Sequence, residues 1–342
     1  MKMAYVTIIS IFLTSLIALI LLRPIAIKLD LVDYPNERKD HIGNIPLIGG
    51  TAIFLGILIH YIFVFDYDKF TSVLLITASL ILFQGVWDDF ANLKARSKIA
   101  FQAFLTVIVI YLTDTKLESF GYLFGDSYHL DLGLFSIPVT IIAVVGLTNA
   151  FNMIDGFDGL ASSFVIIAII GCLGFKVESE ISSFANILFA VIAALVPFMI
   201  FNITSYNKTK VFLGDGGSLF LGYIISWALI YHAENVNNFN HSFALWCVAI
   251  PLFDFFTVII VRILEKRSLV VANKDHIHHF FKSLGFSRML VLGISVLLGF
   301  FCLLIGNLVE DKFPTLSFLV FLIFFLVYLF VRIYYNFKNK VT

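Results

Sequence analysis

Residues 184–203 read FANILFAVIAALVPFMIFNI, a stretch without a single charged side chain. A helix rises about 1.5 Å per residue, so a run of this length spans about 30 Å, the thickness of the hydrocarbon core of a bilayer. Runs of this kind are typical of membrane proteins rather than of soluble domains. The stretch therefore predicts a membrane-spanning helix.

The same pattern recurs along the whole chain. Of the 342 residues, 60% are hydrophobic, 13% are charged and 39 are phenylalanine, which is more apolar surface than a soluble domain could bury. Apolar runs, most of them about 17–22 residues long, lie near 3–22, 47–65, 70–86, 98–112, 135–151, 160–175, 184–203, 216–233, 242–261, 288–306 and 314–333. We expect an all-α polytopic membrane protein with about eleven transmembrane helices, forming one integral-membrane domain over residues 1–342.

The two ends of the predicted spans differ in basic residues, although the net charge is zero. With the N-terminus outside, only five of the 23 Lys and Arg residues face outward, namely Lys2, Lys69, Lys116, Lys176 and Lys312. The other eighteen (23 minus 5) face inward. Basic residues concentrate on the cytoplasmic side of membrane proteins. We therefore expect the C-terminus and the polar motifs described next to be cytoplasmic. The first run lacks a cleavage site and is expected to be a retained span.

Two adjacent carboxylates, Asp88 and Asp89, end the third apolar run. They could hold a cation, or repulsion could leave one of them poised as a base. The alternative is an ordinary hydrated end of a span. Lys98 begins the next run within reach of the pair, and it could neutralise a phosphate or only anchor the helix at the membrane surface.

A row of polar residues begins at the end of the fifth run and continues after it: Asn149, Asn152, Asp155 and Asp158 recur every third residue. Their spacing places them along one end of a helix. A packing role would leave several polar groups to be satisfied in a dry setting. The row therefore favours a functional site.

The stretch from Phe212 to Ser218 surrounds Asp215 with glycines, just before the eighth run. A glycine-rich helix start offers backbone N–H groups to an anion. Asp215 suits a hard divalent cation that bridges phosphates. The stretch matches neither a Walker loop nor a dinucleotide fingerprint, so it is weak evidence by itself.

Three histidines, His276, His278 and His279, lie in a basic connection predicted at 262–287. Clustered histidines can bind metal, exchange protons or donate hydrogen bonds to phosphate oxygens. A zinc site would need further thiolates or spaced carboxylates, which are absent nearby. Contact with phosphate is the better interpretation.

Taken in order, these motifs resemble one known family, the polyprenyl-phosphate N-acetylhexosamine-1-phosphate transferases of glycosyltransferase family 4. The residues that carry the resemblance are Asp33 to His41, which include Arg38, then Pro46, Gly49-Gly50, Trp87-Asp88-Asp89, Asn149 to Gly159, Lys210 to Ser218, Pro251 to Asp254 and Asp275 to His279. The His-Ile-His-His form, Asp254 and the eleven spans are more similar to the branch that uses N-acetylglucosamine than to the peptidoglycan branch. Gly216 stands where the nearest relatives often have alanine.

The resemblance implies a reaction. N-acetylglucosamine 1-phosphate would pass from UDP-N-acetylglucosamine to undecaprenyl phosphate, with release of UMP, as the first membrane step of O-antigen or other cell-surface polysaccharide synthesis. The enzyme would lie in the bacterial inner membrane and depend on Mg²⁺, or on Mn²⁺ in its place. A homodimer fits the family, and no nucleic acid partner is expected.

The resemblance also implies roles for individual residues. Asp88, Asp89 and Asp215 would be catalytic, with Asp88 as the base or at least the acid that readies the lipid phosphate. Asp215 and Asn152 would hold the metal. The residues expected to bind the two substrates are Arg38, Lys98, Asn149, Asp155, Asp158, His276, His278 and His279. Direct attack by the lipid phosphate and a covalent aspartyl intermediate both remain open.

Other functions stay as alternatives. The donor could carry a different N-acetylhexosamine or phospho-N-acetylmuramoyl-pentapeptide. Polar helix ends also occur in secondary transporters, but there the polar groups lie near the membrane midplane, whereas here they lie at one face. Dependence on a divalent metal would separate a transferase from a transporter.

Overall fold

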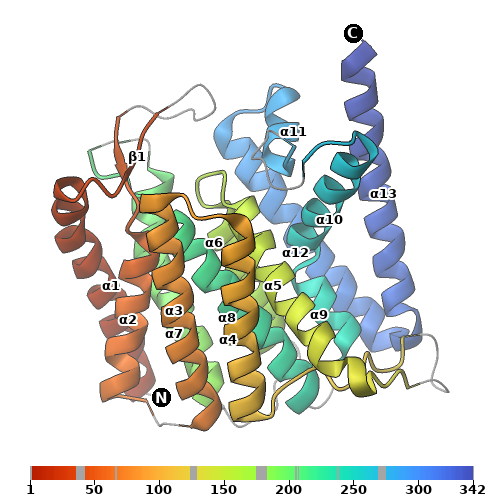
Figure 1. Ribbon diagram of the computed structural model, residues 1–342, viewed down its shortest axis with the longest axis horizontal. Coiled ribbons are helices and arrows are strands. Elements are labelled where there is room, and N and C mark those ends of the chain that lie inside the picture. The colour runs from red at the N-terminus through yellow and green to blue at the C-terminus, as the bar shows by residue number, and fades with distance from the viewer. Residues whose placement is uncertain are drawn as a thin grey trace. The chain divides into compact units, whose positions relative to one another are not determined.

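The computed structural model describes residues 2–35, 43–65, 68–123, 129–174, 183–204, 206, 208–236, 239–268 and 275–341. The described chain is almost entirely helical (Figure 1). The helices are α1 (Lys2–Lys28), α2 (Gly49–Phe63), α3 (Lys69–Ala91), α4 (Ala95–Thr113), α5 (Ser136–Ile154), α6 (Leu160–Gly174), α7 (Ser183–Ile203), α8 (Gly214–Asn235), α9 (His241–Cys247), α10 (Ala249–Leu264), α11 (Ile277–Ser283), α12 (Arg288–Lys312) and α13 (Pro314–Val341), with a 3-10 turn η1 (Gly133–Phe135) before α5. The predicted all-α fold is confirmed.

Eight of these helices are long and apolar enough to cross a membrane. A ninth span is formed if α9 and α10, which meet at an angle of 82°, are counted together. The two remaining predicted runs correspond to α2 and α6, which have only 15 residues each. Helices of that length reach about 22 Å, less than the hydrocarbon core. The count of eleven spans is therefore not confirmed, although every predicted run contains a helix.

The contacts of the chain divide it into two compact units. The first unit comprises Met1–Asp114 and Glu178–Ile225, and the second comprises Thr115–Val177 and Ser226–Thr342. Helix α8 begins in the first unit and ends in the second. A single domain over the whole chain stays a prediction.

In the first unit, α1 packs on α2 and α7 (Figure 1). Two short antiparallel strands, β1 (Val32–Asp33) and β2 (Ile45–Pro46), follow α1. The chain after β2 pairs with the segment before α8, because the N–H groups of Gly49 and Gly50 donate to the carbonyls of Phe212 and Leu213 at 2.9 and 3.0 Å. These bonds hold the starts of α2 and α8 together.

Glycines allow the helices of the first unit to touch through their backbones. A Cβ added to Gly50 would lie 2.1 Å from Cα of Gly217, and one added to Gly85 would lie 2.4 Å from Cα of Gly216. Close backbone approach at small residues is a common way for helices to pack in membranes. The glycines after Asp215 therefore fit α8 against α2 and α3.

In the second unit, α12 packs on α6, α9 and α13. Two of its glycines face large aromatic side chains, since a Cβ would lie 2.8 Å from the Phe164 ring at Gly299 and 2.3 Å from the Trp246 ring at Gly306. The Trp246 ring also makes edge contacts with Phe321 and Phe324 of α13, with 5.3 Å between ring centroids in both cases. Aromatic packing thus joins the helices of this unit.

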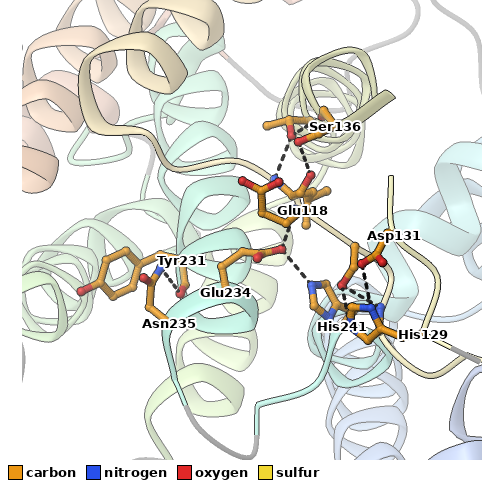
Figure 2. A network of polar contacts seen from close by, with 12 residues as sticks. Glu118, His129, Asp131, Ser136, Tyr231, Glu234, Asn235 and His241 are labelled. Carbon is orange, nitrogen blue, oxygen red and sulfur yellow. Dashed lines mark hydrogen bonds and ion pairs between the residues drawn. The ribbon is translucent and has the colours of Figure 1, made fainter. Parts of the chain in front are cut away.

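The segment before α5 is held by a polar network (Figure 2). The carboxylate of Glu234, near the end of α8, accepts hydrogen bonds from the Glu118 backbone N–H at 3.0 Å and from His241 Nε2 at 2.9 Å. Ser119 and Asp131 form an antiparallel bridge, so this segment is paired like a hairpin. The network lies by the start of α5, away from the row of polar residues at the end of that helix.

Candidate functional site

Each unit carries one cluster of the side chains predicted to be functional. In the first unit the cluster begins with Asp88, which is only 5% exposed in the last part of α3. One carboxylate oxygen of Asp88 accepts a hydrogen bond from the Leu93 N–H at 2.6 Å, and the other is paired with the Lys98 ammonium of α4. The predicted proximity of Lys98 to the acidic pair is confirmed. Asp88 thereby joins the end of α3 to the start of α4.

Asp89 points to a different helix. Its carboxylate accepts hydrogen bonds from the backbone N–H groups of Asp215 at 3.0 Å and Gly216 at 3.5 Å, at the first turn of α8. A helix N-terminus carries unsatisfied N–H groups and a partial positive charge, so a carboxylate is stabilised there. The sequence predicted that an anion is favoured at this helix start. In the structure the Asp89 carboxylate is the anion that accepts from these two donors.

Gly214 explains how Asp89 comes so close. Its φ of +75° is a left-handed conformation that suits glycine, and a Cβ there would lie 2.8 Å from Asp89 Oδ2. The glycine-rich stretch therefore serves to seat the Asp89 carboxylate and to pack α8 closely.

Three carboxylates gather at this place. The Asp89 carboxylate interacts electrostatically with those of Asp88 and Asp215, and Asp215 itself is half-buried at the start of α8. Like charges within electrostatic range of one another favour a bound cation. The donor set is made of oxygens, as Mg²⁺ prefers.

The donor set fits Mg²⁺ better than a metal that needs a complete protein cage. Among the residues that the structure describes, no group of three or more His, Cys, Asp or Glu side chains is arranged to hold a metal ion. Mg²⁺ commonly binds through one or two carboxylates together with substrate phosphates and water. Asp215 fits this mode. Asn152, the other predicted ligand, lies in the second unit.

In the second unit the predicted polar row occupies the end of α5 and the turn after it. Asn149, Asn152, Asp155 and Asp158 are all half-buried there. Asn149 donates to the Val145 carbonyl at 2.7 Å. Asp155 ends the helix, with its N–H bonded to the Asn152 carbonyl at 3.4 Å. The row therefore extends from the last turns of α5 into the turn that follows the helix.

The structure brings this row together with the histidine motif. His278 is only 2% exposed, and a Cβ added to Gly156 would lie 2.8 Å from the His278 ring. The His278 ring also lies 5.9 Å from the Phe157 ring, measured between centroids. Two motifs more than a hundred residues apart in the sequence thus meet in the second unit.

The environment of His278 favours its neutral form. Burial, followed by the neighbouring rings of His279 and His276, holds the pKa of His278 well below its ordinary value. A neutral ring can donate one hydrogen bond to a phosphate but brings no charge. The half-buried His279, whose ring centroid lies 4.2 Å from that of His278, is the more accessible of the two rings.

His276 contacts a buried acid of α10. Its Nδ1 is 2.7 Å from the carboxylate of Asp254 in α10, and it is 8% exposed. Asp254 also accepts from the Ile277 N–H at 2.8 Å and from the Tyr328 hydroxyl at 3.1 Å. The described contact of His276 is thus with a buried acid of the same unit, and its predicted role in substrate binding stays a prediction.

Sequence reasoning missed Tyr328 and Arg332 of α13, which reach the same acid. Arg332 NH1 is 3.4 Å from Asp254, and Arg332 is 4% exposed. The signal was present, since Arg332 is the single charged residue between Pro314 and Tyr335. A charge within an apolar span is a functional signal by default. It was counted only as one of the inward-facing basic residues.

Arg38, the remaining predicted substrate-binding residue, lies outside the described residues. The predicted connection at 262–287 contains a helix, α11, which the sequence did not predict. Before it, Asp275 is paired with two arginines, at 3.5 Å from Arg262 Nε and 3.0 Å from Arg267 NH1. These pairs hold the chain next to the histidine motif.

Comparison with known proteins agrees with the motifs. A family model described as glycosyl transferase family 4 matches residues 71–233. The match begins in α3 and ends in α8, so it contains the acidic pair, the polar row and Asp215.

Curated relatives match over most of the chain. The undecaprenyl-phosphate alpha-N-acetylglucosaminyl 1-phosphate transferase of Salmonella typhi is 35% identical over 306 residues, which cover 85% of this chain and 81% of the relative. The protein of the same name from Escherichia coli strain K12 is 35% identical over 287 residues, 82% of this chain and 76% of the relative. A probable undecaprenyl-phosphate N-acetylglucosaminyl 1-phosphate transferase of Bacillus subtilis is 31% identical over 296 residues, 84% of this chain and 81% of the relative. The chain therefore belongs to glycosyl transferase family 4, as its motifs predicted.

Proposed function

We propose that this protein transfers N-acetylglucosamine 1-phosphate from UDP-N-acetylglucosamine to undecaprenyl phosphate, giving undecaprenyl-pyrophosphoryl-N-acetylglucosamine and UMP. The names of the relatives support the reaction. The structural observation that carries it is the meeting of Asp88, Asp89 and Asp215, with Lys98 beside them, where α3 ends and α8 begins. Acids and a cation arranged in this way suit the transfer of a phosphoryl group between two phosphates.

In the proposed reaction an oxygen of the lipid phosphate bonds to the phosphorus that carries the sugar. The bond from that phosphorus to the oxygen bridging the two phosphates breaks, and UMP leaves with this oxygen. Such a transfer depends mainly on positioning and on neutralising phosphate charge. The residues therefore have to hold two anionic substrates close together.

Lys98 is the cation placed for this purpose in the first unit. Its ammonium is paired with Asp88, so a phosphate that contacts Lys98 also lies next to Asp88. This supports the prediction that Asp88 readies the lipid phosphate, as base or as positioning group. Asp89, which holds the start of α8, keeps Asp215 next to the pair.

Mg²⁺ is part of the proposal, with Mn²⁺ as a substitute. Asp215 would hold the ion, and Asn152 stays its predicted second protein ligand. When bound, the ion would neutralise charge on the pyrophosphate as UMP leaves. The half-buried residues Asn149, Asp155 and Asp158 would hold the nucleotide, and His279 would donate to a phosphate.

The proposal extends to the place of the reaction. A bacterial cytoplasmic membrane, an outer N-terminus, a cytoplasmic site and a homodimer are all parts of it. The basic residues support the orientation, because the positive-inside rule puts them in the cytoplasm.

The test is an assay of the purified protein in detergent with undecaprenyl phosphate, Mg²⁺ and a panel of UDP-N-acetylhexosamines and UDP-N-acetylmuramoyl-pentapeptide. We expect UMP release with UDP-N-acetylglucosamine, and loss of that activity with a chelator. Asp215→Asn keeps the shape of the side chain and removes its charge, so we expect it to be inactive. Asp311→Asn, at an exposed position near the end of α12, is the matched control.

Two results would contradict the proposed reaction, and a third would change its proposed mechanism. UMP release from another donor only would assign a different sugar, and no release from any donor by folded protein would remove the transferase. Trapping of labelled phospho-sugar on Asp88 or Asp89 would replace direct attack with a covalent intermediate.

A further inference from the structure

The histidine motif lies at the start of α11, a helix too short to be stable without contacts to the rest of the protein. Helix α11 has only seven residues, and isolated helices of that length are unstable in water. Yet His278 fits against Gly156 with no room for an added methyl group. Something outside α11 therefore has to set the position of the motif.

Asp254 of α10 supplies the first part of the support. Its two carboxylate oxygens accept from the Ile277 N–H at 2.8 Å and from His276 Nδ1 at 2.7 Å. The first bond satisfies a backbone donor at the start of α11, as an N-cap side chain would. The second sets the orientation of the His276 ring, which stacks on His278 with 6.0 Å between centroids and 8° between planes.

Helix α13 supplies the second part. Asp254 is 1% exposed, and a buried carboxylate needs a cation and hydrogen bonds. Arg332 and Tyr328 provide them at 3.4 and 3.1 Å. Arg332 also donates to the backbone carbonyl of Asp275, the residue before the motif.

The same face of α13 packs on α11 itself. Arg332 lies over the Phe280 ring at 5.1 Å from its centroid, and Tyr335 meets Phe280 edge-on at 4.8 Å. Tyr328, Arg332 and Tyr335 are four and three residues apart, so they form one stripe along α13. This stripe lies far beyond the residues that the family model matches.

We propose that Arg332 and Tyr328 are positioning residues for the histidine motif, acting through Asp254, so that the last helix of the chain sets where His278 and His279 lie. The inference rests on the proposed function for its effect on catalysis. It rests on the contacts alone for its effect on the position of His278.

The test uses the full-length protein in detergent and two independent measurements. The first is the rate at which diethyl pyrocarbonate modifies His278, followed by mass spectrometry of the peptides. The second is kcat and KM for UMP release. The variants are Arg332→Met, Arg332→Lys and Tyr328→Phe, and the matched control is Tyr334→Phe, which changes an exposed tyrosine of the same helix.

We expect Arg332→Met to raise the modification rate of His278 by about tenfold or more, because loss of the support opens the motif locally. The rate at His129, whose side chain is 43% exposed in a different part of the unit, serves as internal reference and is expected to stay unchanged. We expect kcat to fall by about 10-fold to 100-fold, since small misplacements cost that much, with a smaller change in KM. Arg332→Lys restores part of both quantities, Tyr328→Phe has an intermediate effect, and Tyr334→Phe has none.

Two outcomes would overturn the proposal. An unchanged modification rate at His278 in Arg332→Met would mean that Arg332 does not hold the motif. A parallel rise at His278 and His129 would assign Arg332 to general stability only. If the wild-type protein releases no UMP, the proposed function fails, whereas the modification rates still decide the positioning role.

Discussion

The carboxylate of Asp89, at the end of α3, accepts a hydrogen bond of 3.0 Å from the backbone N–H of Asp215, at the start of α8. The two residues are 126 positions apart in the chain. A hydrogen bond thus joins two acids that the sequence suggested for metal or phosphate chemistry. Asp89 therefore has two roles: it caps the N-terminus of α8, and it places a negative charge beside Asp215.

Replacing Asp89 separates these two roles. Asp89→Ala removes the cap, and we expect it to lower the free energy of unfolding by about 1 kcal/mol. Asp89→Asn keeps an oxygen that can accept the Asp215 N–H, so its stability stays near that of the wild type. We expect both variants to lose transferase activity because both lack the charge. Thermal unfolding and UMP release measure the two effects, and full activity in Asp89→Asn would limit Asp89 to capping.

A double-mutant cycle can measure the coupling between the side chains of Asp88 and Lys98. Lys98→Met leaves a buried carboxylate without its cation, and we expect it to destabilise the protein by about 1–3 kcal/mol, less than a fully buried pair because Lys98 is 20% exposed. Adding Asp88→Asn removes the unpaired charge, so the double variant is expected to regain stability but not activity. Destabilisations that simply add would show that the two side chains are not coupled.

Gly85 tests the close approach of α3 to α8. An alanine Cβ there would lie 2.4 Å from the Gly216 backbone, so the helices would have to move apart. We expect Gly85→Ala to lower the free energy of unfolding by about 1–3 kcal/mol, as overpacking does. The control is Gly146→Ala in the middle of α5, where a Cβ would meet nothing within 4 Å. Its expected effect is a gain of up to about 1 kcal/mol, and equal melting temperatures for the two variants would contradict the packing argument.

The lowered pKa of His278 predicts a loss of folding stability at low pH. Its pKa is lowered in the folded protein, so between that value and about 6.5 the unfolded chain binds a proton that the folded chain does not. Stability therefore falls as the pH drops below about 6.5 and is fully present above it.

This effect is measured by melting temperatures at several pH values from about 5 to about 8, on both sides of the ordinary histidine pKa of about 6.5. We expect His278→Gln to show a weaker pH dependence than the wild type. His129→Gln, at an exposed position, serves as control and is expected to keep the full dependence. A wild-type dependence that survives in His278→Gln would mean that other groups cause it.

The sequence predicted many residues of the candidate site, but it did not predict which of them contact one another. The acidic pair, the polar row, Asp215 and the histidines all stand out as polar groups at the ends of apolar runs. Their spacing could not show that Asp89 caps α8, or that His276 contacts Asp254. The break at Val248 between α9 and α10 was also missed, because the apolar run continues across it.

The sequence by itself determined which long apolar segments of this protein are helical. In lipid a backbone must satisfy its own hydrogen bonds, so each long apolar run has only one solution, and that solution is local. The tertiary structure alone decided which polar groups meet. Asp89 with Asp215, His278 with Gly156 and Arg332 with Asp254 are contacts between distant segments. They depend on how closely the glycines and aromatic rings let the helices pack, which no single run of residues can specify.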